Sequence, residues 1–591
     1  MKAESTDANW AGLAKTRTPL ATALLRFTES RRTSWHMPGH DGGFLLPEWL
    51  NDNLSAIDAT ELPETDDLNR PEGPAREAMV LAAAAFGAGI TRFITTGSTT
   101  AIQIMLALAV GRRGRLLVSR CCHQSVVHAA AMLDLDIRFL PATGYPAGLS
   151  AAGVVAGSQA AGSEQLQKEL SLRLALLPQS TPADVAQAIR DNPGCRAVLL
   201  TSPDYYGSCA DLRQIARLVH DAGDLLLVDE AHGAHLAFCP DLLPESAMAA
   251  GADACVQSGH KTLPVLTQGA YLHVSADALS SGRLDRDDLE RLIPVFQTSS
   301  PSFPIAATLD YARAYLAAYG DRLVRRQKEF HDRFAESLPA GWICQPWLPR
   351  PEAGMPDQEG RPTWRFGSDR DPMRLILTIR DPEQVCHVKE QADRMSAAGI
   401  DIEFSDLTRL VLIPSLEQAA ARWQQLTDIL TAPIDGFGRT MRQSTAAENR
   451  RKSAHLLMLE NAWRYLLAEP PEQVVSPGDA LFGMDRSSFQ PAEQLAYQPS
   501  FQPEDQPADQ PTKQPAFRIQ SSGSGRSLRR VPLAESAGCI AASAILPYPP
   551  GIPLIWPGER LDQMRVDFLS ELLENRTSIS GIVQGKLLVL A

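Results

Sequence analysis

Residues 225–233 read Leu-Leu-Leu-Val-Asp-Glu-Ala-His-Gly, and this stretch indicates the fold class. Its first five residues form a nearly continuous apolar run that ends in Asp229. A strand buried on both faces has such a run, and strands of this kind are typical of parallel sheets covered by helices. Ligands of open α/β sheets bind at the carboxyl ends of the strands, so Asp229 is a candidate site residue.

Segments with the patterns of strands and helices alternate on both sides of this stretch, from Pro71 to about Phe303. The alternation predicts an α/β domain in which helices cover a mostly parallel sheet. We expect helices at residues 74–85, 99–110 and 211–222. We expect strands at residues 91–95, 115–119, 137–140, 197–201, 225–229, 254–257 and 269–274.

Three other regions accompany this large domain, to which we assign residues 71–309. Residues 1–70 are expected to form an N-terminal arm with a helical segment, and residues 310–438 a smaller α/β domain. Residues 439–591 are expected to form a C-terminal α+β domain. Within that domain, residues 487–530 contain six Gln-Pro dipeptides. Such a composition cannot bury a core, so we expect a disordered, extended insert, with a docking strip as the alternative.

Composition excludes several classes of protein. The 591 residues include 56 Lys and Arg against 69 Asp and Glu, and the resulting net charge of -13 argues against a nucleic-acid partner. No apolar run approaches the roughly 18 residues that span a bilayer, so we expect no membrane partner and a cytoplasmic location. Nine Cys without a Cys-x-x-Cys pair favour reduced thiols over a disulfide framework.

A lysine follows one of the predicted strands, in Ser258-Gly259-His260-Lys261-Thr262. A loop lysine is ordinarily a solvated surface residue, but Lys261 would share its sheet edge with Asp229. The turn at residues 95–100 adds Gly97 and hydroxyl groups that could bind a phosphate at a helix N-terminus, although such turns also cap helices without a ligand. A lysine, a buried acid and a phosphate cup suit pyridoxal phosphate, because its aldehyde forms a Schiff base with an amine and its ring nitrogen needs an anion.

Histidines and cysteines offer two further interpretations. His123, in Cys121-Cys122-His123-Gln124, follows another strand and supplies an imidazole that could stack on the cofactor ring. Together with His232, His235 and Cys239, this cluster could instead suggest zinc. The spacings match no closed structural site, so we expect no metal. A serine hydrolase is also disfavoured, because no Gly-x-Ser-x-Gly elbow occurs.

Longer strings extend this interpretation over nearly the whole chain. They are His36-Met37-Pro38-Gly39-His40, Thr60-Glu61-Leu62-Pro63, Asp66-Asp67-Leu68, Pro71-Glu72-Gly73-Pro74, Thr96-Gly97-Ser98-Thr99, Asp229-Glu230-Ala231-His232-Gly233, Ser258-Gly259-His260-Lys261-Thr262, Gln297-Thr298-Ser299-Ser300-Pro301-Ser302, Pro547-Tyr548-Pro549-Pro550-Gly551-Ile552-Pro553 and Pro557-Gly558-Glu559. In these strings the sequence resembles the ornithine/lysine/arginine decarboxylases, fold-type I enzymes that use pyridoxal phosphate, in the short form that lacks a receiver-like N-terminal domain.

The resemblance implies a fold-type I large domain and a role for each site residue. Lys261 would carry the cofactor, Asp229 would pair with its ring nitrogen, and His123 would stack on its ring. Thr298 would reach the phosphate in the neighbouring subunit, which implies a homodimer or a higher homo-oligomer. Glu559 would border the distal amine of the substrate. The other residues implied around the cofactor are Gly97, Ser98, Thr99, Ala231, His232, Ser258 and His260.

The implied reaction is the decarboxylation of lysine, arginine or ornithine to cadaverine, agmatine or putrescine, which is a reaction of polyamine biosynthesis. The sequence does not rank these three substrates. Asp41 stands where related proteins often have a basic residue, which could alter the entrance charge. An aminotransferase or an aldolase would share Lys261 and Asp229, and a regulatory protein that binds the cofactor without catalysis is a further alternative.

Overall fold

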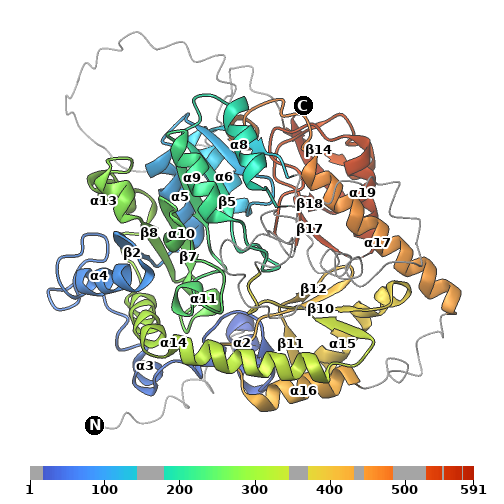
Figure 1. Cartoon of the computed structure of the whole chain (residues 1–591). Coiled ribbons are helices and arrows are strands. Elements are labelled where there is room, and N and C mark those ends of the chain that lie inside the picture. The colour runs from blue at the N-terminus through green and yellow to red at the C-terminus, as the bar shows by residue number, and fades with distance from the viewer. Residues whose placement is uncertain are drawn as a thin grey trace, which may run out of the picture.

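The computed structural model of the chain describes residues 18–142, 179–344, 370–431, 445–482, 528–548, 551–575 and 577–590 (Figure 1). Most of the predicted Gln-Pro insert, residues 487–527, lies outside these ranges. Its last three residues do not belong to an insert, because they form the start of strand β14 (Leu528–Pro532), which pairs with β19 (Lys586–Leu590).

The large domain is built on a seven-stranded sheet in the order β2-β8-β7-β6-β5-β3-β4. The strands are β2 (Ile90–Ile94), β3 (Arg115–Ser119), β4 (Asp136–Leu140), β5 (Ala197–Thr201), β6 (Leu225–Asp229), β7 (Ala254–Ser258) and β8 (Ala270–Val274). All seven predicted strands are present, each within one residue of the expected bounds. Strand β8 runs antiparallel to β2 and β7, and the other neighbouring pairs are parallel.

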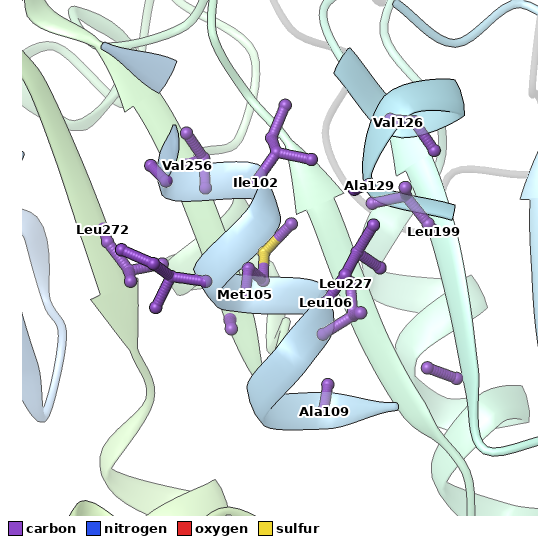
Figure 2. Close-up of a cluster of buried hydrophobic side chains, with 14 of the residues drawn as sticks. Ile102, Met105, Leu106, Ala109, Val126, Ala129, Leu199, Leu227, Val256 and Leu272 are labelled. Atoms are coloured by element: carbon purple, nitrogen blue, oxygen red, sulfur yellow. The ribbon is translucent and has the colours of Figure 1, made fainter. Parts of the chain in front are cut away.

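Helices cover both faces of this sheet (Figure 1). Side chains alternate between the two faces along each strand, so Leu227 faces α5 (Ser98–Ala109) while Leu226 packs on the opposite side with α9 (Leu212–Asp221). Figure 2 shows Ile102, Met105 and Leu106 of α5 lying over the central strands; all three are at most 1% exposed. This packing fixes the carboxyl ends of β6 and β7, where the predicted site residues lie.

The remaining helices of the large domain are α4 (Pro74–Phe86), α6 (Gln124–Leu133), α8 (Pro182–Asp191), α10 (Ala247–Ala250), α11 (Gly259–Thr262), α12 (Ala276–Ser280) and α13 (Arg286–Phe296). Local sequence explains their ends. Helix α8 begins with a capping box between Thr181 and Asp184 and has Pro182 at its first position. Helix α4 ends at Gly87, which has a left-handed φ of 72° and closes the helix as a C-terminal glycine does.

The smaller domain has a four-stranded antiparallel sheet in the order β12-β13-β10-β9. Its elements are β9 (Trp342–Cys344), β10 (Leu375–Ile379), α15 (Val388–Ala397), β11 (Ile400–Ile402), β12 (Phe404–Ser405), β13 (Arg409–Leu412) and α16 (Ala420–Thr431). The 35-residue helix α14 (Phe303–Ser337) leads into it, so the boundary predicted at residue 309 falls inside a continuous helix.

The N-terminal region holds α2 (Pro19–Glu29), β1 (Thr33–Trp35) and α3 (Glu48–Asn53). Part of this region joins the smaller domain, because β1 pairs in parallel with β11. Trp35 is fully buried there and meets Trp423 edge-to-face at 4.9 Å between ring centroids. The predicted arm is therefore an integral part of the smaller domain at this point.

The C-terminal region is α+β, as predicted. It contains α17 (Ala446–Ala468), α18 (Pro477–Phe482), β14, β15 (Ile540–Ala541), β16 (Leu546–Tyr548), α19 (Gln563–Glu574), β17 (Ser578–Ser580), β18 (Ile582–Val583) and β19. All nine cysteines lie in the described residues, and none of them is paired in a disulfide there. Among the helices of the described ranges, none is both long and apolar enough to cross a bilayer.

Candidate active site

Asp229 and Lys261 meet at the carboxyl edge of the sheet, as predicted. Asp229 ends β6 and is 2% exposed, and its Oδ1 accepts a hydrogen bond from the Ala231 amide at 3.2 Å. Burial raises the pKa of Asp229, while the Lys261 charge and the Ala231 amide lower it. Burial lowers the pKa of Lys261 to about 8, although the Asp229 charge opposes this shift.

His232 bridges Lys261 and a second cation, Arg374. The Nε2 atom of His232 lies 3.0 Å from Lys261 Nζ, and its Nδ1 atom contacts Nη2 of Arg374. A guanidinium only donates hydrogen bonds, so Nδ1 must accept and the neutral ring carries its proton on Nε2. That proton then points at Lys261 Nζ, which accepts it only as a neutral amine. Burial, with the positive charges of Lys261 and Arg374, lowers the pKa of His232 well below its usual value, so its ring is neutral.

Arg374 has unused donors within the protein interior. Its side chain is fully buried, and its Nε and Nη1 atoms make no hydrogen bond to any residue that the structure describes. Gly207 makes this position possible: its φ is +86°, and a Cβ there would lie 2.9 Å from Arg374 Cβ. A buried guanidinium with free donors is suited to bind an anion that enters from outside the chain.

The turn before α5 forms an anion cup. Gly97 precedes the helix with a φ of +94° and cannot cap it with a side chain, so within the described part of the chain the first amides of α5 are available. The hydroxyls of Thr96 and Ser258 are buried and have no hydrogen-bond partner in the described part of the chain. Ser98 and Thr99, both predicted from the sequence, occupy the first turn of α5.

His260 links this cup to the lysine segment. Gly97 lies beside Gln268, and the next residue, Gly269, presents its carbonyl oxygen 3.2 Å from His260 Nδ1. Burial and the neighbouring Lys261 lower the pKa of His260 to about 4, so its ring is neutral. Gly97 of the cup and His260 of the lysine segment therefore contact two consecutive residues, Gln268 and Gly269.

His123 is held in a defined orientation at the start of α6. Its Nδ1 atom accepts a hydrogen bond from the Ser125 amide at 3.2 Å and lies 2.9 Å from the Ser125 hydroxyl. Burial, with the Lys261 charge, lowers the pKa of His123 to about 4. A neutral imidazole in this position agrees with the predicted stacking role.

Thr298 lies apart from this cluster. It is exposed, its carbonyl oxygen accepts a hydrogen bond from Asn69 at 2.9 Å, and its hydroxyl faces Ser300. No contact between Thr298 and the Lys261 cluster is present among the described residues. Its predicted role in a neighbouring subunit remains a prediction.

Glu559 has a different partner from the predicted one. The side chain is fully buried, and its two oxygens bind the guanidinium of Arg120, with Nη2 to Oε2 at 2.8 Å. The Trp556 amide also donates to Oε2 at 2.7 Å. The expectation that Glu559 faces the distal amine of the substrate is thus corrected, because a buried arginine needs this carboxylate as its counter-charge.

Two other carboxylates lie near the site. Asp41, expected to alter the entrance charge, is neutralised by Arg422, whose Nη1 donates to it at 2.6 Å. Glu403, which sequence reasoning missed, accepts hydrogen bonds from Tyr205 Oη at 2.6 Å and the Met37 amide at 3.1 Å. The charge of Glu403 acts to raise the pKa of Lys261.

The residues considered for zinc bind other partners. His232 contacts Lys261 and Arg374 as described above, and His235 Nε2 lies 3.0 Å from Asp371 Oδ1. Cys239 Sγ lies 3.4 Å from Asp241 and 3.3 Å from Asp321, and both carboxylates also pair with Arg325. His232 and His235 thus have different direct partners, while Cys239, Asp241 and Asp321 have ligand atoms within 4.8 Å of one another and form a group that could hold a metal ion.

Two family profiles match this chain. The profile of "Orn/Lys/Arg decarboxylase, major domain" matches residues 18–366, and that of the C-terminal domain matches residues 505–584. An uncharacterized protein of Bacillus subtilis, YaaO, is 29% identical over 96% of this chain and 97% of its own. An arginine decarboxylase of Bacillus anthracis is 26% identical over 96% of each chain. The lysine decarboxylase LdcA of Pseudomonas aeruginosa is 24% identical over 95% of this chain and 76% of its own.

Solved structures confirm the predicted fold. Lysine decarboxylase A from Pseudomonas aeruginosa superposes with a TM-score of 0.66 at 19% identity, covering 98% of this chain and 81% of that one. The constitutive lysine decarboxylase of E. coli gives a TM-score of 0.65 at 19% identity, with coverages of 98% and 82%. Because the major-domain profile covers more than half of the sequence, the chain belongs to the ornithine/lysine/arginine decarboxylase family.

Proposed function

We propose that this protein uses pyridoxal phosphate to decarboxylate a basic L-amino acid, namely lysine, arginine or ornithine. The observation that carries the proposal is the buried Lys261 amine, whose pKa is lowered to about 8 and which lies 3.0 Å from His232 at the sheet edge where Asp229 is buried. Family membership supports the same reaction class.

The described residues suit this cofactor. The uncapped start of α5 and the partnerless Ser258 hydroxyl would hold the phosphate, Lys261 would attach the aldehyde, and Asp229 would hold the ring nitrogen in its protonated state. When bound, the cofactor supplies an electron sink for the electrons that the departing carbon dioxide leaves behind. His123 would cover one face of the ring and exclude water from it.

Arg374 is the candidate for orienting the substrate. Its free Nε and Nη1 atoms would donate to the α-carboxylate, which is the group to be lost. Orientation selects the reaction, because the bond that breaks is the one aligned with the ring's π-system. His232 would keep Lys261 unprotonated while a substrate amine displaces it.

Arginine is the first substrate to test. The arginine decarboxylase of Bacillus anthracis matches this chain over 96% of its own length, whereas the Pseudomonas aeruginosa lysine decarboxylase is matched over 76% of its own. The purified protein should be incubated with arginine, lysine and ornithine while carbon dioxide and the amine product are measured. Release of both from one basic substrate is expected. Exchange of amino groups with a keto acid would point to an aminotransferase, and cofactor binding without turnover to a regulatory protein.

The attachment of pyridoxal phosphate to the apoprotein should depend on pH in a defined way. Only the neutral amine reacts, so below the pKa of Lys261 the rate should rise about tenfold per pH unit, and it should level off above about 8. With a lysine of ordinary pKa, 10.5, the attachment rate would keep rising until the pH approached that value. Stopped-flow absorbance measures the rate. A rise that continues to pH 10 would contradict the lowered pKa.

We further propose a homodimer in which the exposed Thr298 reaches the partner subunit's cofactor phosphate. The supporting observation is its exposure. Light scattering of the purified protein tests the dimer.

A cytoplasmic location is proposed on the composition of the sequence.

A further inference from the structure

The turn between β3 and α6 is tied to the C-terminal domain by a buried ion pair. Arg120 directly follows β3, is 2% exposed, and donates from Nη2 to Glu559 Oε2 and to the Leu554 carbonyl, both at 2.8 Å. Its guanidinium lies over the Phe139 ring, 4.6 Å from the centroid. Removing one partner of such a pair leaves a buried charge without compensation, so the two residues hold each other in place.

Apolar packing supports the same junction. Cys121 belongs to the apolar cluster of the C-terminal domain, together with Leu554 and Leu561, while the next residue, Cys122, belongs to the core of the large domain. In the reverse direction, Trp556 packs into the large-domain core. Close-packed interiors transmit small shifts, so a displacement at Arg120 would be carried along this turn to His123.

The far end of α6 is held by the same domain. Gly478 in α18 lies so close to α6 that a Cβ on it would be 2.7 Å from the Ala131 carbonyl oxygen. The C-terminal domain therefore contacts the β3–α6 segment before His123 and again at the end of the helix that His123 begins.

We propose that Glu559 is a positioning residue, which fixes the His123 turn through Arg120 and so shapes the cofactor site without touching cofactor or substrate. This inference rests on the proposed function, because pyridoxal phosphate is the ligand that His123 would cover. It assigns the C-terminal domain a part in cofactor binding. It also explains why a carboxylate in the Pro-Gly-Glu turn is fully buried.

Glu559→Gln tests the inference, because it keeps the side-chain size and removes the charge. The matched control is Glu460→Gln: Glu460 is also buried in the C-terminal region, where it pairs with Arg409 and Arg464 rather than with the His123 turn. The readouts are the Kd for pyridoxal phosphate on the apoprotein, the visible circular dichroism of the bound cofactor, and the melting temperature.

Glu559→Gln is expected to weaken cofactor binding by about 10- to 100-fold and to change the dichroism, since small misplacements of site groups have effects of this order. Glu460→Gln should lower the melting temperature but leave the Kd within about twofold. Equal losses of cofactor affinity in both variants, or an unchanged Kd in Glu559→Gln, would overturn the inference. If Glu559→Gln raised the KM for a basic substrate and left the cofactor Kd unchanged, Glu559 would instead be a substrate-binding residue.

A second variant covers the case in which Glu559→Gln does not fold. Arg120→Met combined with Glu559→Leu removes both charges, so that neither is left unpaired in the interior. Weak cofactor binding by this folded double variant supports the positioning role, and a wild-type Kd overturns it. The wild-type chain is titrated first. If it binds no pyridoxal phosphate, both the proposed function and this inference fail. If it binds the cofactor normally, a negative result with the variants overturns only the positioning role of Glu559.

Discussion

Lys261→Ala is expected to lose at least about a thousandfold in kcat, because it removes the amine that would attach the cofactor. Losses up to about a millionfold follow removal of a nucleophile from other enzymes that use covalent catalysis. The geometry adds a reason: Lys261 Nζ lies 3.0 Å from His232 Nε2, and burial lowers the pKa of the amine to about 8, which increases its neutral, reactive fraction. Turnover is measured as carbon dioxide release under saturating substrate and cofactor.

Two control variants distinguish the loss of the nucleophilic amine from the loss of its positive charge. Lys261→Arg keeps a cation beside Asp229 but cannot attach the aldehyde, so it should be as inactive as Lys261→Ala. Lys389→Ala changes an exposed lysine in α15 and should retain full activity. Borohydride reduction of the wild-type holoenzyme, followed by peptide mapping, should place the pyridoxyl group on Lys261. A label on another lysine, or more than about a tenth of the wild-type activity in Lys261→Arg, would contradict the assignment.

The sheet could be predicted closely because its information is local. The central strands are runs of mostly apolar residues, such as 225–229. Consecutive apolar residues indicate that a strand is buried on both faces. The same holds for Asp229 and Lys261, which directly follow or end such runs. Parallel strands bring their carboxyl ends to one edge, so local patterns sufficed to place these two residues together.

The Glu559 role was wrong because its determinant is not local. Its partner, Arg120, lies 439 residues away in the sequence, and nothing in the Pro-Gly-Glu string indicates a buried guanidinium opposite it. Arg374 was missed for the same reason. It stands at the start of an apolar strand like many surface arginines, and its approach to His232 requires the close packing at Gly207, which is a property of the assembled domains.

Asp229→Asn is expected to bind pyridoxal phosphate yet lose on the order of a hundredfold or more in kcat. The amide can still accept a hydrogen bond, but it carries no charge to hold the ring nitrogen protonated, and loss of one preorganised electrostatic group costs about this much. Burial makes the effect large, since at 2% exposure little water screens the carboxylate from its partner.

A second buried aspartate provides the matched control for this variant. Asp253 is fully buried and accepts hydrogen bonds from the Leu226 amide at 2.8 Å and from Arg283, near the opposite end of β6 from Asp229. Asp253→Asn should lower the melting temperature and leave kcat nearly unchanged. Measuring kcat, cofactor Kd and melting temperature for both variants separates a loss of stability from a loss of chemistry. If Asp229→Asn kept near-normal turnover, the ring nitrogen would not be paired with Asp229, and the electron sink would need another source of charge in this site.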